Sequence, residues 1–387
     1  MPQWASFAVF FSIVSSIYGT AHYYLYSWFV RLAEPSKKVR SLLRLFFIFL
    51  VASLPTAKFL GWYDFNVFSY LLALMASVWM GLVLYLFLFA LGCDLLIALF
   101  KKFFSGPKVS SRRSLFNRRL LLAGIGGCVL MIGGLAVKEA RDLQVTRLEV
   151  SLRGLPPELD GFSLVQVSDV HYGMLTENGR LSLIISRINE LQPDVVVITG
   201  DLVDEGVSHM EEMSVPLSRL KSRQGIFAVT GNHEYYAGVD RAIAIMKGAR
   251  IRVLRNEVAI LNGGLQMVGI DDPTGSRRVG NPAPDFEKIL ARLDPQKPSI
   301  LLYHQPIKFE EVASAGVDLQ LSGHTHGGQL FPVRYISQMI YPRTPGLHQI
   351  GKSYLYVSRG AGTWGPPMRL LSPPELVYIR LRSQKTK

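Results

Sequence analysis

The strongest constraint on this chain of 387 residues is the concentration of long apolar runs in its first 144 residues. Runs of about 18 or more apolar residues can cross a bilayer as helices, because backbone polar groups in lipid must bond within the helix. Buried helices of a soluble protein would instead show a polar stripe. The second run is the least clear, because charged residues lie at its ends and Pro55 lies inside it. We predict about four membrane-spanning helices, at residues 4–30, 42–60, 65–100 and 120–137.

The charge distribution orients these predicted spans. Residues 1–144 carry 15 basic and five acidic side chains, whereas residues 145–387 carry 27 and 24. The basic excess lies in two short loops, residues 31–44 and 101–119, which the positive-inside rule places in the cytoplasm. With four spans, everything after Val137 then lies outside the cytoplasm. The nearly neutral remainder has no basic patch with interleaved aromatic residues, so we expect a membrane and no nucleic acid as a partner.

Two further features of the first region have structural explanations. Residues 111–116 and 117–122 each resemble a twin-arginine export signal, although a basic loop beside a membrane explains the same arginines. No small-residue cleavage site follows, so we expect an anchor that stays attached. The two cysteines, Cys93 and Cys128, lie inside predicted spans and provide neither a disulfide framework nor a thiolate metal site.

From residue 145 onward the pattern changes to that of an α/β domain. Short apolar runs of strand length recur, and the stretch 177–191 has apolar residues at helical spacing. We therefore divide the chain into a transmembrane region, residues 1–144, and an α/β domain, residues 145–387. Functional groups of such domains gather at the carboxyl ends of strands. The predicted strands are residues 162–167, 195–199, 226–230, 265–270, 299–303 and 319–322.

Polar residues with metal-binding side chains follow five of these strands. Five of the eight histidines of the chain occupy this kind of position, whereas His22, His209 and His348 have no such context. Two of the five, His324 and His326, lie one residue apart on a glycine-bounded turn, and imidazole is a common ligand of divalent transition metals. A metal site is therefore the first hypothesis. The residues at the strand ends are Asp169, His171, Asp201, Asn232, His233, His304, His324 and His326.

In this order, the motifs Asp-x-His, Gly-Asp, Gly-Asn-His-Glu, His and Gly-His-x-His resemble those of the calcineurin-like metallophosphoesterase family. The flanking residues 254–257, 269–272 and 326–329 are similar to the membrane-associated bacterial branch of that family. The resemblance spans residues 162–329 and does not cover the first three predicted spans. It implies a four-layer α/β/β/α sandwich, here preceded by an all-helical transmembrane region, in the bacterial inner (plasma) membrane.

The resemblance also implies two divalent metal ions of the manganese, iron or zinc class. Two ions about 3.5–4 Å apart can generate a hydroxide near neutral pH and clamp a phosphoryl group. Asp201 would bridge them. By motif position, one ion would be bound by Asp169, His171, Asp201 and His326, and the other by Asp201, Asn232, His304 and His324.

His233 is left free of metal by this assignment, and in the family this histidine assists the leaving oxygen. Asp204 occupies the position of the acidic residue that orients it, although it could also be a loop carboxylate or a helix cap. Protein Ser/Thr phosphatases of the family have an arginine directly after that aspartate. This chain has Glu205 there, which argues against a phosphoprotein substrate.

We therefore expect a membrane-anchored, metal-dependent phosphoric ester hydrolase acting on phosphodiesters or on lipid-linked phosphate esters. Two alternatives stay open: a cytoplasm-facing pyrophosphatase acting on a nucleotide-linked lipid precursor, and a non-catalytic sensor or adaptor with a structural metal site. Transport is less favoured, because Asp94 is the main charge within the spans. Residues 272–284 and 332–351 form either a substrate rim or ordinary surface connections. The natural substrate, the native metal and the oligomeric state stay undetermined.

Overall fold

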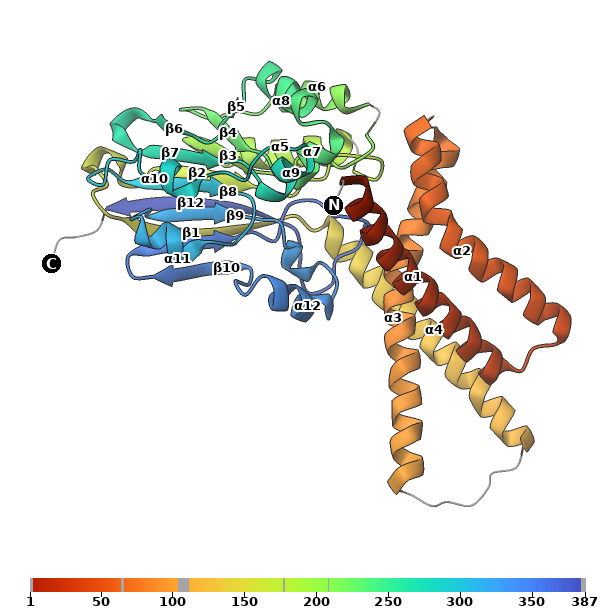
Figure 1. Cartoon of the computed structure of the whole chain (residues 1–387). Helices are drawn as coiled ribbons and strands as arrows, with labels where there is room; N and C mark the ends of the chain where they lie inside the picture. Colours follow the sequence, from red (N-terminus) through yellow and green to blue (C-terminus); the bar gives the residue numbers. More distant parts are fainter. Residues whose placement is uncertain (1–2, 64–65, 104–110, 177, 208, 384–387) are drawn as a thin grey trace. The chain divides into compact units, whose positions relative to one another are not determined.

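The computed structural model describes residues 3–63, 66–103, 111–176, 178–207 and 209–383, and Figure 1 traces the chain. The chain divides into two compact units, Met1–Val137 and Lys138–Lys387. Each unit is described by itself. The division falls inside a helix, so the last turn of that helix belongs to the second unit.

The first unit consists of four long helices, as its apolar runs predict. Three segments within the described residues are long and apolar enough to cross a membrane: Lys37–Gly61, Val67–Phe100 and Leu120–Arg141. The remaining predicted span, residues 4–30, begins with side chains that lie outside the described residues, and it stays a prediction. Most side chains of the two twin-arginine stretches also lie outside them. The helices are α1 (Gln3–Ala33), α2 (Lys37–Tyr63), α3 (Val67–Phe103) and α4 (Ser111–Arg141).

The charge expected inside the third span is paired. Arg31 donates hydrogen bonds of 2.9 and 2.6 Å to the two carboxylate oxygens of Asp94, and the Tyr24 hydroxyl donates another of 2.9 Å. A charged residue in a membrane helix is costly unless it is paired in this way. The pairing gives Asp94 a structural role within the helical unit.

The second unit contains two six-stranded sheets. The strand order is β1-β12-β2-β3-β4-β5 in the first sheet and β10-β11-β9-β8-β7-β6 in the second. The first sheet comprises β1 (Gln144–Leu152), β2 (Ser163–Val167), β3 (Val195–Thr199), β4 (Ile226–Val229), β5 (Arg252–Val253) and β12 (Glu375–Ser383). The second comprises β6 (Glu257–Ile260), β7 (Gln266–Ile270), β8 (Ser299–Tyr303), β9 (Leu319–Ser322), β10 (Gly346–Ile350) and β11 (Ser353–Val357).

Short helices connect and cover these strands. They are α5 (Asn178–Glu190), α6 (Ser214–Leu217), α7 (Asn232–Ala237), α8 (Val239–Gly248), α9 (Pro273–Arg278), α10 (Phe286–Leu290), α11 (Phe309–Ser314) and α12 (Val333–Ile340). Single 3-10 turns occur at Pro157–Leu159, Met210–Met213, Asn262–Gly264 and His326–Gly328.

The layers follow from the alternation of side chains along the buried strands. In β3, Val195 and Val197 face the second sheet, where they pack in one cluster with Ile300 and Leu302 of β8. The intervening Val196 and Ile198 belong to the opposite cluster, which contains the apolar face of α5. The outer face of the second sheet packs on α10 in the same way. The unit is therefore the expected four-layer α/β/β/α sandwich.

All six predicted strands are present, with ends that differ by at most one residue from the predicted ones. Strands β2, β3 and β4 are parallel, and so are β7, β8 and β9, so the carboxyl ends within each set lie at one edge. The edges of the two sheets meet, because His304 Nδ1, after β8, lies 2.8 Å from the carbonyl oxygen of Thr199, at the end of β3.

Strands β1 and β12 were not predicted, and their pairing has a consequence for the anchor. Strand β12 is antiparallel to β2, with Val377 opposite Gln166, so β12 begins near the edge where β2 ends. Strand β1 is parallel to β12, with Gln144 opposite Glu375. Because β1 starts directly after α4, the last turn of α4 lies at the edge where the predicted metal ligands gather.

Candidate metal centre

The loops that follow the parallel strands bring all seven predicted metal ligands to one edge of the sandwich. Three carboxyl ends in the first sheet and two in the second supply them, in the order that the strand-end rule predicts. All but His324 are buried, and His324 is partly exposed. Asp169 and His171 follow β2, Asp201 follows β3, Asn232 begins α7 after β4, His304 follows β8, and His324 and His326 follow β9.

Four overlapping groups of possible metal ligands lie among the described residues, and in each group one atom per side chain lies within 4.8 Å of the others. Two of these groups consist only of predicted ligands, and the other two contain His233. We call Asp169, His171 and His326 the first half-site. His171 Nε2 lies 3.0 Å from His326 Nε2, which lies 3.6 Å from Asp169 Oδ1. Two ring nitrogens this close, next to a carboxylate, leave room for a shared cation that would bind all three.

We call Asn232, His304 and His324 the second half-site, and Asp201 is counted separately because it lies close to both half-sites. His304 Nε2 lies 3.0 Å from Asp201 Oδ2 and 3.1 Å from His324 Nδ1. The other nitrogen of His304 points to a backbone carbonyl, which fixes its proton there and leaves Nε2 to bind a metal. Asp201 Oδ2 is also 3.8 Å from His171 Nε2, so this carboxylate faces both half-sites.

Two buried oxygens test whether these residues fit a metal. Asp169 Oδ2 and Asn232 Oδ1 have no hydrogen-bond partner among the residues that the structure describes. Buried polar atoms are otherwise nearly always paired, because an unpaired one costs about 1–3 kcal/mol. One of these oxygens belongs to each half-site. Carboxylate, amide and imidazole groups together suit divalent ions such as manganese, iron or zinc, so the residues fit.

The backbone at this edge is strained in a way that serves the cluster. Non-glycine residues rarely adopt positive φ angles, which cost about 1–3 kcal/mol and cluster at functional sites. Gly231 and Gly323 permit the close approach of the loops, since a Cβ atom there would clash with Asp201 and Asp169, respectively. Five of the seven predicted ligands have positive φ: Asp169 (53°), His171 (50°), Asp201 (51°), His324 (71°) and His326 (49°).

Glu234 is a buried residue that the sequence analysis did not single out, although it ends the Gly-Asn-His-Glu motif. Its carboxylate accepts hydrogen bonds from the backbone N–H groups of Gly231 (2.6 Å), Asp201 (3.0 Å) and Leu202 (2.7 Å). Burial, together with the charge of Asp201, raises its pKa. Glu234 thus joins the loops after β3 and β4 and positions Asp201 beside Asn232.

Arg369 is a second residue that the sequence analysis missed, and it is fully buried. Its guanidinium donates to the carbonyl oxygens of Gly362 and Ser372 at 2.9 Å each, and its Nη2 lies 3.2 Å from His326 Nδ1. Ser372 Oγ donates a further bond of 2.7 Å to the carbonyl of His326. Burial, with the neighbouring charges of His171 and Arg369, holds the pKa of His326 well below its usual range.

The loop that supports His326 is also bonded to the end of α4. The backbone N–H groups of Leu371 and Ser372 donate to the Glu139 carboxylate at 3.1 and 2.7 Å. Glu139 belongs to the last turn of α4, which is part of the second unit. A short path of hydrogen bonds therefore links this helix turn, through Ser372, to the first half-site.

The predicted acid pair lies beside the half-sites. His233 Nδ1 lies 2.9 Å from Asp204 Oδ1 and 3.0 Å from Glu205 Oε2. Burial lowers the pKa of His233, but the carboxylates of Asp201, Asp204 and Glu205 outweigh it and raise the pKa to about 11. Glu205, which argues against a phosphoprotein substrate, thus also lies beside this histidine.

The histidines without strand-end context lie elsewhere. His22 is within the helical unit, where Trp79 Nε1 donates to its Nε2 at 2.8 Å. His348 Nε2 lies 2.6 Å from the Thr344 carbonyl oxygen. His209 packs near the ring of Tyr172, with 6.4 Å between the ring centres. None of the three belongs to the clusters of possible metal ligands among the described residues.

Each of the two predicted rim segments contains a helix, and one of the segments contacts a predicted metal ligand. Residues 332–351 include α12, and the Tyr341 hydroxyl after this helix lies 2.8 Å from His324 Nε2. Arg343, in the same segment, forms an ion pair with Glu310. Residues 272–284 include α9, where the guanidinium of Arg278 lies 4.3 Å from the ring centre of Tyr236. Tyr341 is therefore the rim residue with a direct contact to a predicted ligand.

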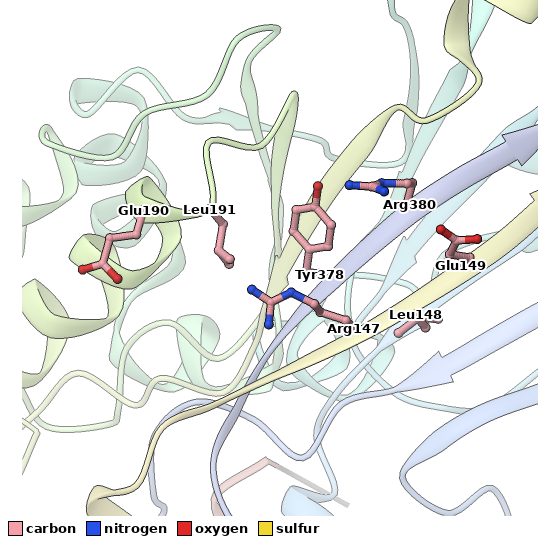
Figure 2. Close-up of a pocket in the computed structure, with 7 residues that line it drawn as sticks. All are labelled: Arg147, Leu148, Glu149, Glu190, Leu191, Tyr378 and Arg380. Atoms are coloured by element: carbon pink, nitrogen blue, oxygen red, sulfur yellow. The ribbon is translucent and has the colours of Figure 1, made fainter.

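A separate open hollow of about 420 Å³ lies on the outer face of the first sheet, over β1 and β12 (Figure 2). Arg147 and Arg380 flank Tyr378, each with its guanidinium carbon 5.9 Å from the ring centre. Glu149 and Glu190 also line it, so its charge is mixed. It contains none of the predicted ligands, and the metal centre is the better candidate for chemistry.

The chain is similar to proteins from bacteria and animals. The family model described as "Calcineurin-like phosphoesterase" matches residues 162–328. An uncharacterized metallophosphoesterase of Campylobacter jejuni is 31% identical, and the alignment covers 98% of this chain and all of the relative. A Danio rerio protein described as "Transmembrane protein with metallophosphoesterase domain" is 35% identical over 78% of this chain and 71% of its own length.

An uncharacterized metallophosphoesterase of Helicobacter pylori is 39% identical over 56% of this chain, and the chain spans 59% of that relative's length. The three apolar helices and the transmembrane relative indicate membrane association. The family match coincides with the segment that contains all seven predicted ligands. The chain belongs to the calcineurin-like phosphoesterase family of metal-dependent phosphoric ester hydrolases.

Proposed function

We propose that the chain is a membrane-anchored phosphoesterase that binds two divalent ions and hydrolyses phosphodiesters or lipid-linked phosphate esters. The observation that carries this proposal is the arrangement of the two half-sites around Asp201, together with the predicted acid His233 beside Asp204 and Glu205. A site that only stabilised the fold would have no use for a histidine that lies beside two carboxylates and is assigned to neither ion. This argues against a sensor or adaptor with a structural metal.

The first half-site and Asp201 would hold one ion, and the second half-site, again with Asp201, would hold the other. Bound there, the ions would supply Lewis-acid activation of water and neutralise charge on the phosphoryl oxygens. The protein supplies the rest. The backbone strain and the glycine contacts fix the ligands, and the buried bonds of Glu234 and Arg369 keep them in place.

His233 would act at the leaving oxygen. Its Nδ1 lies 2.9 Å from Asp204 Oδ1 and 3.0 Å from Glu205 Oε2, so Nε2 would be the atom that donates a proton as the P–O bond breaks. The two carboxylates beside this ring favour a substrate with one negative charge over one with two. A phosphodiester has one such charge and a phosphomonoester near neutral pH has nearly two. The proposal therefore places diesters ahead of monoesters.

The membrane tether favours substrates that are themselves in the membrane, because it raises the effective concentration of the site there. We propose that the protein resides in the bacterial inner membrane with its phosphoesterase domain outside the cytoplasm, as four spans and the basic loops predict. A reporter enzyme fused after Lys387 and active only outside the cytoplasm would support this. A reporter active only inside would favour the cytoplasm-facing pyrophosphatase.

The direct test uses the full-length protein, purified in detergent and loaded with manganese. Hydrolysis of a chromogenic phosphodiester is compared with that of the corresponding monoester, with and without a chelator. We expect faster diester hydrolysis that the chelator abolishes. Activity that survives metal removal, or turnover of neither ester with metal bound, would contradict the proposal.

A further inference from the structure

Helix α12 (Val333–Ile340) lies at the rim of the metal centre. It is amphipathic, but its polar face points towards the rest of the domain and its apolar face towards solvent, which is the reverse of an ordinary surface helix. The side of α12 that points towards the rest of the phosphoesterase domain borders a hollow of about 200 Å³, which is lined by Ser337, Gln338 and the following Tyr341. Residues at spacings of three and four share one face of a helix. The polar face of α12 is therefore turned inward, and none of its residues is buried.

The opposite face of α12 is apolar and open to solvent. Tyr335, Ile336, Met339 and Ile340 have exposed fractions of 55%, 61%, 85% and 67%. A soluble helix normally directs such residues to the core. An exposed apolar cluster of this kind next to a functional site indicates a surface that interacts with a membrane or with another protein. We call these four side chains the apolar face of α12.

Leu371 is another exposed apolar residue near α12, and it connects the rim to the last turn of α4. Leu371, with 64% of its surface exposed, lines the same hollow as the polar side of α12. The backbone N–H of Leu371 donates to Glu139, and the apolar span that contains Glu139 ends at Arg141. The rim is thus bonded, within the second unit, to the helix turn where the chain leaves the predicted span.

The surroundings of this face are those of an interfacial helix. Such helices place aromatic and aliphatic residues about 5–10 Å deep at the boundary of headgroups and acyl chains, with basic residues alongside. Arg334 and Arg343 line the hollow beside the apolar face. Trp364 is half exposed and lies near His233, with 5.9 Å between the ring centres. Tryptophan and tyrosine favour this boundary.

We propose that the apolar face of α12, together with Leu371, inserts into the bilayer interface and holds the metal centre against the lipid headgroups. The occupant of this face is the membrane in which the chain is already anchored. The membrane contact follows from the exposed side chains and from the bonds to Glu139. Its consequence, that the enzyme takes the phosphoester group of a lipid, rests on the proposed function.

The contact is tested with the full-length protein in vesicles of phosphatidylcholine and phosphatidylglycerol. Cys93 and Cys128 are replaced by serine, and Met339→Cys is labelled with an environment-sensitive fluorophore. Lipids with a quencher on the acyl chain report insertion. The matched control is Ile260→Cys, which is 65% exposed on β6 and is paired with Gln266 at the start of β7, away from the metal centre.

We expect acyl-chain quenching several times stronger at position 339 than at position 260. Equal quenching at both positions would overturn the proposal. Protection of the label at 339 without lipid quenching, accompanied by energy transfer between labelled copies, would assign the face to a second copy of the chain and would also overturn it. This readout does not depend on enzymatic activity.

The consequence for the substrate has its own measurement. Ile336→Gln combined with Met339→Gln is compared with Ile260→Gln, and each is assayed on a vesicle-borne phosphodiester lipid and on a soluble chromogenic diester. We expect the ratio of lipid to soluble activity to fall about tenfold only in the double variant. An unchanged ratio would overturn the role in substrate choice. If the unmodified protein hydrolyses neither ester, the proposed function fails while the quenching result still decides the membrane contact.

Discussion

The two half-sites of the metal centre are supported by different parts of the fold. The second half-site is held from within the sheets, by the carboxylate of Glu234 and by the carbonyl at the end of β3. The first half-site is held by the C-terminal segment with Arg369 and Ser372, which also bonds to the last turn of α4. One half is therefore part of the sandwich core, and the other is built from the segment that adjoins the anchor.

This difference suggests how the membrane and the chemistry are coupled. Changes in the core support should disturb the second half-site in any environment. Changes in the C-terminal support should disturb the first half-site and depend on the anchor turn. Asp201, which faces both, belongs to neither side of this division.

The largest effect is expected for Asp201→Asn, because both half-sites lose the carboxylate that they share. Metal-assisted charge stabilisation is worth several kcal/mol, so we expect diester hydrolysis to fall about 1,000-fold, or about 4 kcal/mol. Steady-state kinetics of the full-length protein with manganese provide the measurement, and Asp240→Asn, at an exposed position on α8, is the control. A decrease of less than tenfold would remove Asp201 from its shared role.

The next largest effect is expected for Asp204→Asn, which removes the carboxylate beside His233 and thereby weakens the acid function. With a diester whose leaving group is an alkyl alcohol, we expect a loss of about 100-fold, because proton donation to such a poor leaving group contributes 10²–10⁴-fold. With a nitrophenyl diester, whose leaving group needs no proton, the loss should be a few-fold. Equal losses on the two esters would contradict the assignment of His233 as the acid.

Glu234→Gln should act on the second half-site through the backbone. The amide group of glutamine would bring donors against the N–H groups that now donate to the carboxylate. Leaving one buried group unpaired costs about 1–3 kcal/mol, so we expect a lower melting temperature together with about tenfold less activity. The control is Glu287→Gln at an exposed site in α10. Wild-type values of both quantities would show that Glu234 does not position Asp201.

Arg369→Lys should act mainly on the first half-site. Lysine keeps the charge but cannot make the same set of bonds to surrounding carbonyls. Residues behind metal ligands typically contribute 10–100-fold to metal affinity, and we expect about tenfold more manganese to be required for half-maximal activity. A manganese titration, with the exposed Arg380→Lys as the control, measures this. Activity at saturating manganese should fall less in the Arg369 variant than in the Glu234 variant. A larger fall in the Arg369 variant would contradict the difference between the supports of the two half-sites.

The sequence predicted the residues of the half-sites better than the strands and side chains that support them, for a physical reason. Short apolar runs predict buried strands such as β3 and β8, and strand ends predict where Asp201 and His304 lie. By contrast, β1 alternates apolar with exposed polar residues and therefore has no continuous apolar run. Arg369 is separated by 43 residues from His326, and a buried arginine has no local pattern.

Two other features had usable signals in the sequence. Glu234 is the last residue of the Gly-Asn-His-Glu motif, but the motif alone does not show that its carboxylate accepts hydrogen bonds from four backbone N–H groups. Helix α12 was predicted only as part of a possible rim segment. The pairs at 335–336 and 339–340 have helical spacing, whereas the Pro and Gly residues around them favour a loop.

The most direct test of the account counts the metal ions in the full-length protein. Manganese is measured by mass spectrometry after reconstitution and removal of excess metal, in parallel with diester hydrolysis, for the wild type and for Asp201→Asn. We predict two ions per chain in the active wild type, with fewer ions and no appreciable activity in the variant. Two ions per chain without hydrolysis of any phosphoester, or full hydrolysis with none, would contradict a two-metal phosphoesterase.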